Sequence, residues 1–121
     1  MLNDVRGIDH LYIAVGYTDL RRGIDGLSSI IQKTFHLDPY QNSLFLFCGR
    51  RTDRIKALLW EGDGFLLLYK RLETGRFQWP RSESELRELT MQQYRWLTEG
   101  LAVEQAKSIP RVYPGTYKAG L

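Results

Sequence analysis

Cysteine and histidine are scarce in this sequence, which has one cysteine, Cys48, and two histidines, His10 and His36. A lone cysteine cannot form an intramolecular disulfide, so we expect a protein of a reducing compartment, the cytoplasm. Structural zinc sites require clustered cysteines and histidines. We therefore expect no metal site and no other cofactor.

Long hydrophobic runs are also absent. No segment comes near the roughly 20 apolar residues that a membrane-spanning helix needs. The N-terminal stretch MLNDVRGIDHLYIAVG has acidic residues early and only a short apolar run, so we expect no secretory signal peptide. These absences favour a soluble, cytoplasmic protein.

The acidic residues do not form a recognisable catalytic pattern. A metal-dependent nuclease needs two or three converging carboxylates, and the candidates are Asp19, Asp25, Asp53, Glu61 and Asp63. Helix-cap and turn preferences explain each of them better, with Asp19 expected to cap a helix. No base-activated nucleophile is recognisable around the cysteine either. We expect a protein that is not an enzyme, and we keep a metal nuclease as a third hypothesis.

The chain has 121 residues, with 43% hydrophobic and 26% charged residues. These values are typical of a single folded domain. Residues 1–106 are predicted to form one α+β domain. Residues 107–121 contain two prolines and two glycines without a clear period, which predicts an extended or mobile C-terminal tail.

The first part of the chain predicts a strand and then a helix. Residues 10–15 alternate, with Leu11, Ile13 and Val15 on one face. Thr18 is a suitable helix N-cap, and apolar residues then recur every three or four positions to about residue 34. Gly23 and Gly26 each cost a helix about 1 kcal/mol. They indicate either close packing against a neighbour or a helix that begins after Thr18, behind a loop.

The middle of the chain predicts a meander, with strands over residues 44–49, 55–61, 65–73 and 76–79. The loop at residues 62–64 and other short connections favour antiparallel neighbours. The strands are almost continuously apolar, which indicates cover on both faces of the sheet. One helix covers one face, so the other requires further helices, a second subunit or a partner.

Two short helices are predicted after the meander. Ser82-x-x-Glu85 has the spacing of a capping box and predicts a helix ending near residue 89. Thr90 is predicted to cap a second helix, with Leu89, Tyr94 and Leu97 buried. The complete expectation is an α+β fold: an antiparallel meander sheet of about four to five strands, packed with one longer N-terminal helix and short C-terminal helices.

Positive charge is concentrated in one segment. The whole chain has a net charge of +3, whereas residues 50–81 have eight basic and four acidic residues, a local excess of four. A localised excess is typical of a surface that contacts phosphates. The alternative is a sheet edge that lysine and arginine protect against association with other strands.

Four stretches resemble one family in order and spacing. They are GYTDLRRGIDGL from residue 16, LDPY from residue 37, LFLFCGRRTDRIKALLWEGDGF from residue 44 and YKRLETGRFQWP from residue 69. Together they resemble the TnpB-type accessory protein, the Orf2-like second reading frame, of insertion sequences of the IS66 type. This family is distinct from the RNA-guided nuclease of the same name. The resemblance implies a small protein encoded beside a separate transposase, which assists DNA transposition and has no established catalytic centre.

We therefore predict a non-catalytic accessory protein of DNA transposition that contacts DNA phosphates at the element ends, the transposase, or both. The alternative is a module that binds the transposase without touching nucleic acid; a homo-oligomer is also possible. Arginine and lysine suit phosphate oxygens. The candidate nucleic-acid-binding residues are Arg50, Arg51, Arg54, Lys56, Lys70, Arg71 and Arg76, with Arg21 and Arg22 as a second patch. The candidate supporting aromatic residues are Trp60, Tyr69 and Trp79. We expect these rings either to support the surface or to stack on exposed bases.

Overall fold

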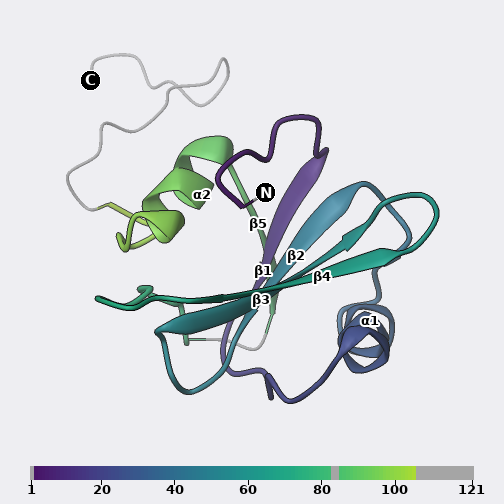
Figure 1. Cartoon of the computed structure of the whole chain (residues 1–121), viewed down its shortest axis with the longest axis horizontal. Helices are drawn as coiled ribbons and strands as arrows, with labels where there is room; N and C mark the ends of the chain where they lie inside the picture. The colour runs from purple at the N-terminus through teal and green to yellow at the C-terminus, as the bar shows by residue number, and fades with distance from the viewer. Residues whose placement is uncertain (1, 83–84, 106–121) are drawn as a thin grey trace, which may run out of the picture.

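The computed structural model describes residues 2–82 and 85–105. A five-stranded sheet forms the centre of the fold, in the order β4-β3-β2-β1-β5, and the two helices lie on opposite sides of it (Figure 1). The elements are β1 (His10–Ala14), α1 (Ile24–Lys33), β2 (Ser43–Cys48), β3 (Arg54–Trp60), β4 (Phe65–Arg71), β5 (Leu86–Leu89) and α2 (Met91–Thr98). The predicted tail at residues 107–121 lies outside the described residues.

The sheet is mixed, which corrects the prediction of an antiparallel meander. β1 and β2 are parallel, with Leu11 opposite Leu44 and Ile13 opposite Leu46. Parallel neighbours need a long crossover connection, and the segment between β1 and β2 supplies one, because it contains α1. The sequence predicts this helix at the correct place in the chain. The expected antiparallel sheet is wrong at β1 and β2 because the helix provides the crossover that makes these strands parallel.

The helix α1 begins after the loop, at Ile24, and not at Thr18. Gly23 occupies the N-cap position, while the backbone N–H of Thr18 donates to the carbonyl of Cys48 at the end of β2 (2.9 Å). The later start agrees with the second explanation offered for the two glycines. Residues 15–23 consequently form a loop beside the end of β2, and this loop contributes to the site described below.

The predicted meander is confirmed for three strands. β2 pairs antiparallel with β3, and β3 with β4, so that Phe45, Leu58 and Leu67 lie side by side. The fourth predicted strand is wrong: residues 76–79, all within the described part of the chain, form no strand. Phe77 and Trp79 are instead buried against the sheet, and burial of their rings replaces strand pairing in fixing this segment.

The helix predicted from Ser82 and Glu85 is also wrong, because β5 forms there and pairs antiparallel with β1. The unpaired edge of β1 offers backbone hydrogen bonds that a local capping preference cannot reveal. The second predicted helix is confirmed as α2. Thr90 and Gln93 form a reciprocal capping box at its start, and the predicted apolar residues of this region are buried.

Apolar side chains cover both faces of the sheet. Leu27 and Ile31 of α1 pack with Phe45, Phe47 and Leu58 on one face. The cluster on the other face joins apolar side chains of α2, of the N-terminal residues and of the 77–79 segment to the sheet. The second face therefore has cover from within the chain. No helix of the described residues is long and apolar enough to span a membrane.

Candidate nucleic-acid interface

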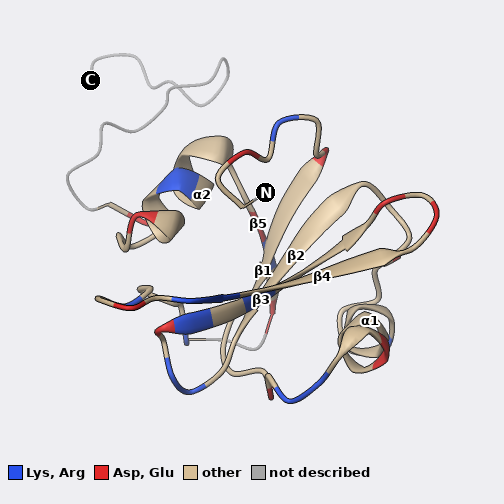
Figure 2. Cartoon of the chain, viewed as in Figure 1, with Lys and Arg blue, Asp and Glu red and all other residues tan. Residues whose placement is uncertain are grey.

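One end of the sheet gathers most of the predicted cationic residues. β1 and β2 are parallel and β3 and β4 follow in alternating directions, so the ends of β1, β2 and β4 and the start of β3 meet there. Figure 2 shows blue segments at this end of β3 and β4 and on the loops below them, whereas the opposite β3–β4 loop is red. We call this region the basic end, and the predicted residues that lie there are Arg21, Arg22, Arg50, Arg51, Arg54, Lys56, Arg71 and Arg76.

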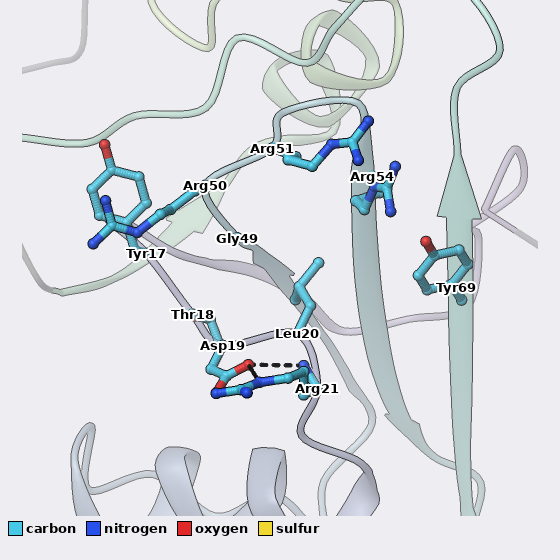
Figure 3. Close-up of a pocket in the computed structure, with 10 residues that line it drawn as sticks. All are labelled: Tyr17, Thr18, Asp19, Leu20, Arg21, Gly49, Arg50, Arg51, Arg54 and Tyr69. Carbon is cyan, nitrogen blue, oxygen red and sulfur yellow. Dashed lines mark hydrogen bonds and ion pairs between the residues drawn. The ribbon is translucent and has the colours of Figure 1, made fainter.

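A pocket of about 660 Å³ opens at the basic end, between the loop after β1, the loop after β2 and the end of β4 (Figure 3). Its lining contains four arginines from three separate segments, with Asp19 paired to one of them, and Leu20 and Gly49 add apolar surface. The arginines are Arg21, Arg50, Arg51 and Arg54, and the two aromatic residues of the lining are Tyr17 and Tyr69.

A second hollow of about 310 Å³ lies beside the first. Arg50 and Arg51 line both, and Arg76 joins them in the second, together with Asp53 and Glu73. Arg50 and Arg51 therefore lie between two concave surfaces, which places them at the centre of the basic end.

The alternation of the strands separates Lys70 from the other candidates. Arg54 lies opposite Arg71, and Lys56 opposite Tyr69, on the face that α1 covers. Lys70 lies opposite Ile55, which is buried in the cluster on the other face. Successive residues of a strand point to opposite faces, so the structure does not bring Lys70 together with its neighbours.

Lys56 joins the strands to the loop before α1. Its ammonium group donates to the carbonyl of Arg22 at 3.0 Å. This bond connects β3 to the segment that contains the second predicted patch. The two patches, proposed from separate parts of the sequence, therefore belong to one surface.

Acidic residues neutralise part of this surface. Asp53 pairs with Arg54 (3.0 Å) and, more loosely, with Arg51 (3.5 Å). The hydrogen bond from Arg54, followed by the charges of both arginines, lowers the pKa of the Asp53 carboxyl. Asp19 pairs with Arg21 (2.8 Å), whose hydrogen bonds hold the pKa of Asp19 at about 2. Both acids are therefore negatively charged at neutral pH.

Four of the predicted cations at the basic end have no such acidic partner. Within residues 2–82 and 85–105, Arg22, Arg50, Lys56 and Arg76 form no ion pair, whereas Arg71 pairs with Glu73 at 3.1 Å. The basic end thus combines cations that are paired with acids and cations that form no ion pair.

The comparison with known proteins identifies the family. A sequence model described as IS66 Orf2-like protein (TnpB of IS66) matches residues 9–108. The chain belongs to this family. The resemblance inferred from the sequence motifs is therefore confirmed, and the family suggests an accessory role in transposition.

Two relatives of this IS66 Orf2-like protein come from Sinorhizobium fredii. The uncharacterized protein y4jC is 30% identical over 110 residues, which cover 91% of this chain and 93% of the relative. The uncharacterized protein y4hO is 35% identical over 91 residues, which cover 75% and 79% of the two chains. No solved structure matches.

The sequence analysis missed Arg81 as a residue of the basic end. Its guanidinium group donates to the carbonyls of Gly16 (2.7 Å) and Gly49 (2.5 Å), which follow β1 and β2. It also lies 4.0 Å from the centre of the Tyr17 ring, over which Arg50 lies at 5.3 Å. Arg81 is 65 residues from Gly16 along the chain, so no local pattern predicts this contact; only its place in the basic segment hinted at it.

The three predicted aromatic residues lie in different places. Tyr69 lines the pocket, and 53% of it is exposed. Trp79 is buried, and its indole N–H donates to the carbonyl of Ala14 (2.9 Å), so it supports the basic end from inside. Trp60 lies at the opposite end of β3, where its ring packs against Tyr40 and Phe65.

Metal ligands do not gather in the described part of the chain. Among residues 2–82 and 85–105, no three histidine, cysteine, aspartate or glutamate side chains are close enough to hold a metal ion. The prediction that Asp19 caps a helix is wrong. Its carboxylate instead accepts hydrogen bonds from the backbone N–H and the side chain of Arg21 in a turn. Cys48 is buried, and this burial raises the pKa of its thiol.

Proposed function

We propose that this member of the IS66 Orf2-like family is a non-catalytic accessory protein of DNA transposition that works in the cytoplasm and contacts DNA phosphates through its basic end. The observation that carries the proposal is the convergence of arginines from three segments around one pocket, with Arg50 and Arg51 shared by a second hollow. The guanidinium group suits phosphate because it offers paired donors in one plane.

The pattern of ion pairs supports a division of work among these arginines. Asp53 and Asp19 hold Arg54 and Arg21 in fixed positions and offset part of their charge. Arg22, Arg50 and Arg76 have no acidic partner in the described part of the chain. A phosphate gains most from a cation whose charge is not already neutralised, so we assign the main contacts to these three residues. Arg51 is added because its pair with Asp53 is long, at 3.5 Å.

DNA binding at two salt concentrations tests the proposal. Fluorescence anisotropy with a duplex of the element end, at roughly 50 and 200 mM salt, should show a steep loss of affinity with salt. Each phosphate contact contributes about 0.9 to the slope of log affinity against log salt. The double variant Arg50→Ala/Arg51→Ala should therefore have a slope shallower by about two.

A matched control removes the same charge elsewhere. Arg6, which precedes β1, and Arg95, within α2, line one hollow, whereas the basic end lies where β1 ends. The double variant Arg6→Ala/Arg95→Ala should retain the slope of the unmodified protein. Absence of binding at both salt concentrations would refute DNA contact, and equal losses in the two double variants would refute its assignment to the basic end.

A second candidate function, binding to the transposase, has its own observation. Tyr40, Trp60 and Phe65 form a ring cluster at the end of β3 opposite Arg54, with centroids 4.9–5.2 Å apart. We call this cluster, with Glu61 and Asp63 of the adjoining loop, the aromatic end. Tyrosine and tryptophan are enriched in protein interfaces, and Tyr40 is 53% exposed.

Capture of the cognate transposase, with and without nuclease treatment, tests this second function. Capture that survives nuclease and weakens in Tyr40→Ala would support direct contact through the aromatic end. Capture that disappears with nuclease would show that DNA alone joins the two proteins. The Tyr69→Ala variant, which removes an equally exposed tyrosine from the basic end, is the matched control.

A further inference from the structure

The pocket at the basic end has features that phosphate contact alone does not require. Figure 3 shows Tyr17 with Arg50 on one side and Tyr69 on the other, with Leu20 and Gly49 between them, Arg51 and Arg54 above, and the Asp19–Arg21 pair below. The backbone of a duplex needs only cations. A hollow that combines rings, apolar surface and guanidinium groups also offers a place for a base.

The two tyrosines have different roles in this arrangement. Tyr17 already has Arg81 and Arg50 over its ring, at 4.0 and 5.3 Å, so it fixes the position of Arg50. Tyr69 is 53% exposed and takes part in no ring stacking within the described residues. Its ring is therefore the available stacking surface of the pocket.

The space at the centre of the pocket depends on Gly49. A Cβ atom at this position would lie 3.3 Å from the carbonyl oxygen of Thr18 and 3.4 Å from the Leu20 side chain. Any larger residue would press on the loop after β1. The glycine thus lets the two loops approach closely while leaving the hollow between Tyr17 and Tyr69 open.

We propose that this pocket holds an unpaired nucleotide of single-stranded DNA, with its base against Tyr69 and its flanking phosphates against Arg50 and Arg51. The proposal rests on the DNA contact proposed above and adds the form of DNA. Paired bases in a duplex are stacked on each other and hide their faces from a side chain. Bases of a single strand are free to stack on an aromatic ring while cations follow the backbone.

A comparison of single-stranded and duplex probes of one sequence tests the proposal. Base stacking on an aromatic side chain is strong enough that Tyr69→Ala should weaken single-strand binding by at least about fivefold. The same substitution should change duplex binding by less than about twofold, because the ring does not reach paired bases. Tyr69→Phe should retain single-strand affinity, and Tyr69→Leu, which keeps apolar bulk without a ring, should behave like Tyr69→Ala.

Tyr40→Ala is the matched control, because Tyr40 has the same 53% exposure at the aromatic end. It should leave binding of both probes unchanged. If neither probe binds the unmodified protein, both this inference and the DNA contact fail. If duplex binding depends on Arg50 and Arg51 but single-strand binding is indifferent to Tyr69, the pocket proposal alone is overturned.

Discussion

The two ends of the β3–β4 hairpin are built from the same pair of strands in opposite ways. At the aromatic end, Trp60 and Phe65 lie opposite each other and pack ring against ring. At the basic end, Arg54 lies opposite Arg71, a pair of like charges that strand pairing alone would disfavour. One end is held by apolar contact, and the other is held by hydrogen bonds and ion pairs.

This difference shows that the basic end is built to position charged side chains for a site, whereas the aromatic end is built like a core. Asp53 and Glu73 each form an ion pair with one of the facing arginines. Arg81 joins the loops after β1 and β2 through their carbonyls. Charged groups are thereby kept at the surface in fixed positions, whereas apolar packing would have removed them from contact with a ligand.

The largest expected effect is the loss of Arg81. Hydrogen bonds from a charged group contribute about 1.5–3 kcal/mol each, and Arg81→Ala removes the bonds to Gly16 and Gly49. We expect the free energy of unfolding, measured with urea, to fall by about 3 kcal/mol, with weaker DNA binding as the loops separate. Arg81→Lys should recover less than half, because one ammonium group does not reproduce the planar fork.

Arg87→Ala provides the control for Arg81. Arg87 pairs with Glu85 (3.2 Å) and Glu104 (3.6 Å) at the side of the sheet. Pairs of this kind contribute up to about 1 kcal/mol. A loss in Arg81→Ala no greater than in Arg87→Ala would show that the basic end does not depend on the guanidinium contacts.

The next effect in size is expected at the aromatic end. Trp60→Ala removes a half-buried ring and its contacts with Tyr40 and Phe65. The free energy of unfolding should fall by about 2 kcal/mol, given the value of aromatic pairs and of buried apolar area. DNA affinity should stay within about twofold, because a seven-residue strand separates the two ends by roughly 20 Å. If DNA affinity in Trp60→Ala fell together with the free energy of unfolding, the two ends would not be functionally separate.

A smaller effect should follow the removal of an acid from the basic end. Asp53→Asn keeps the shape of the side chain but releases Arg51 and Arg54 from a negative charge. Duplex DNA affinity should rise by about two- to fivefold, the range expected for a partly exposed charge. Asp63→Asn, in the loop at the aromatic end, should leave affinity unchanged because salt screens charges beyond about 10 Å. Equal gains in both variants would indicate an effect of net charge alone.

The smallest expected effect is the pH dependence of the Asp19–Arg21 pair. The pKa of Asp19 is about 2 in the folded chain, below its ordinary value of 3.8. A carboxyl whose pKa is lowered by folding stabilises the fold above its unfolded pKa, and that contribution is lost as pH falls through the folded pKa. Between pH 5 and pH 2.5, Asp19→Asn should therefore lose slightly less thermal stability than the unmodified protein, as should Arg21→Gln. A steeper loss in either variant would contradict the pairing.

The sequence patterns were most reliable where short-range forces decide. The meander of β2, β3 and β4 follows from short turns and apolar runs, and the capping box of Thr90 and Gln93 starts α2 as local hydrogen bonding requires. The pattern at Ser82 and Glu85 failed because the free edge of β1 captured the following residues as β5. A local capping preference stabilises a helix less than a ladder of backbone hydrogen bonds stabilises a strand on a sheet.

The candidate site was predictable in composition but not in arrangement. The sequence shows that residues 50–81 are rich in arginine, and the structure places most of these cations at one end. It also moves Trp60 to the far end and Lys70 to the other face. Tyr17 and Arg81 gain their importance only through contacts between distant segments.

By itself, the sequence determined the family, the excess of positive charge and the three-strand meander, because these depend on motifs, composition and neighbours along the chain. Only the tertiary structure decided that β1 and β2 run parallel and that β5 completes the sheet. It also decided that the loops after β1 and β2 meet around a pocket. The physical reason is that these features arise from hydrogen bonds and charges brought together across long chain separations, which no local pattern records.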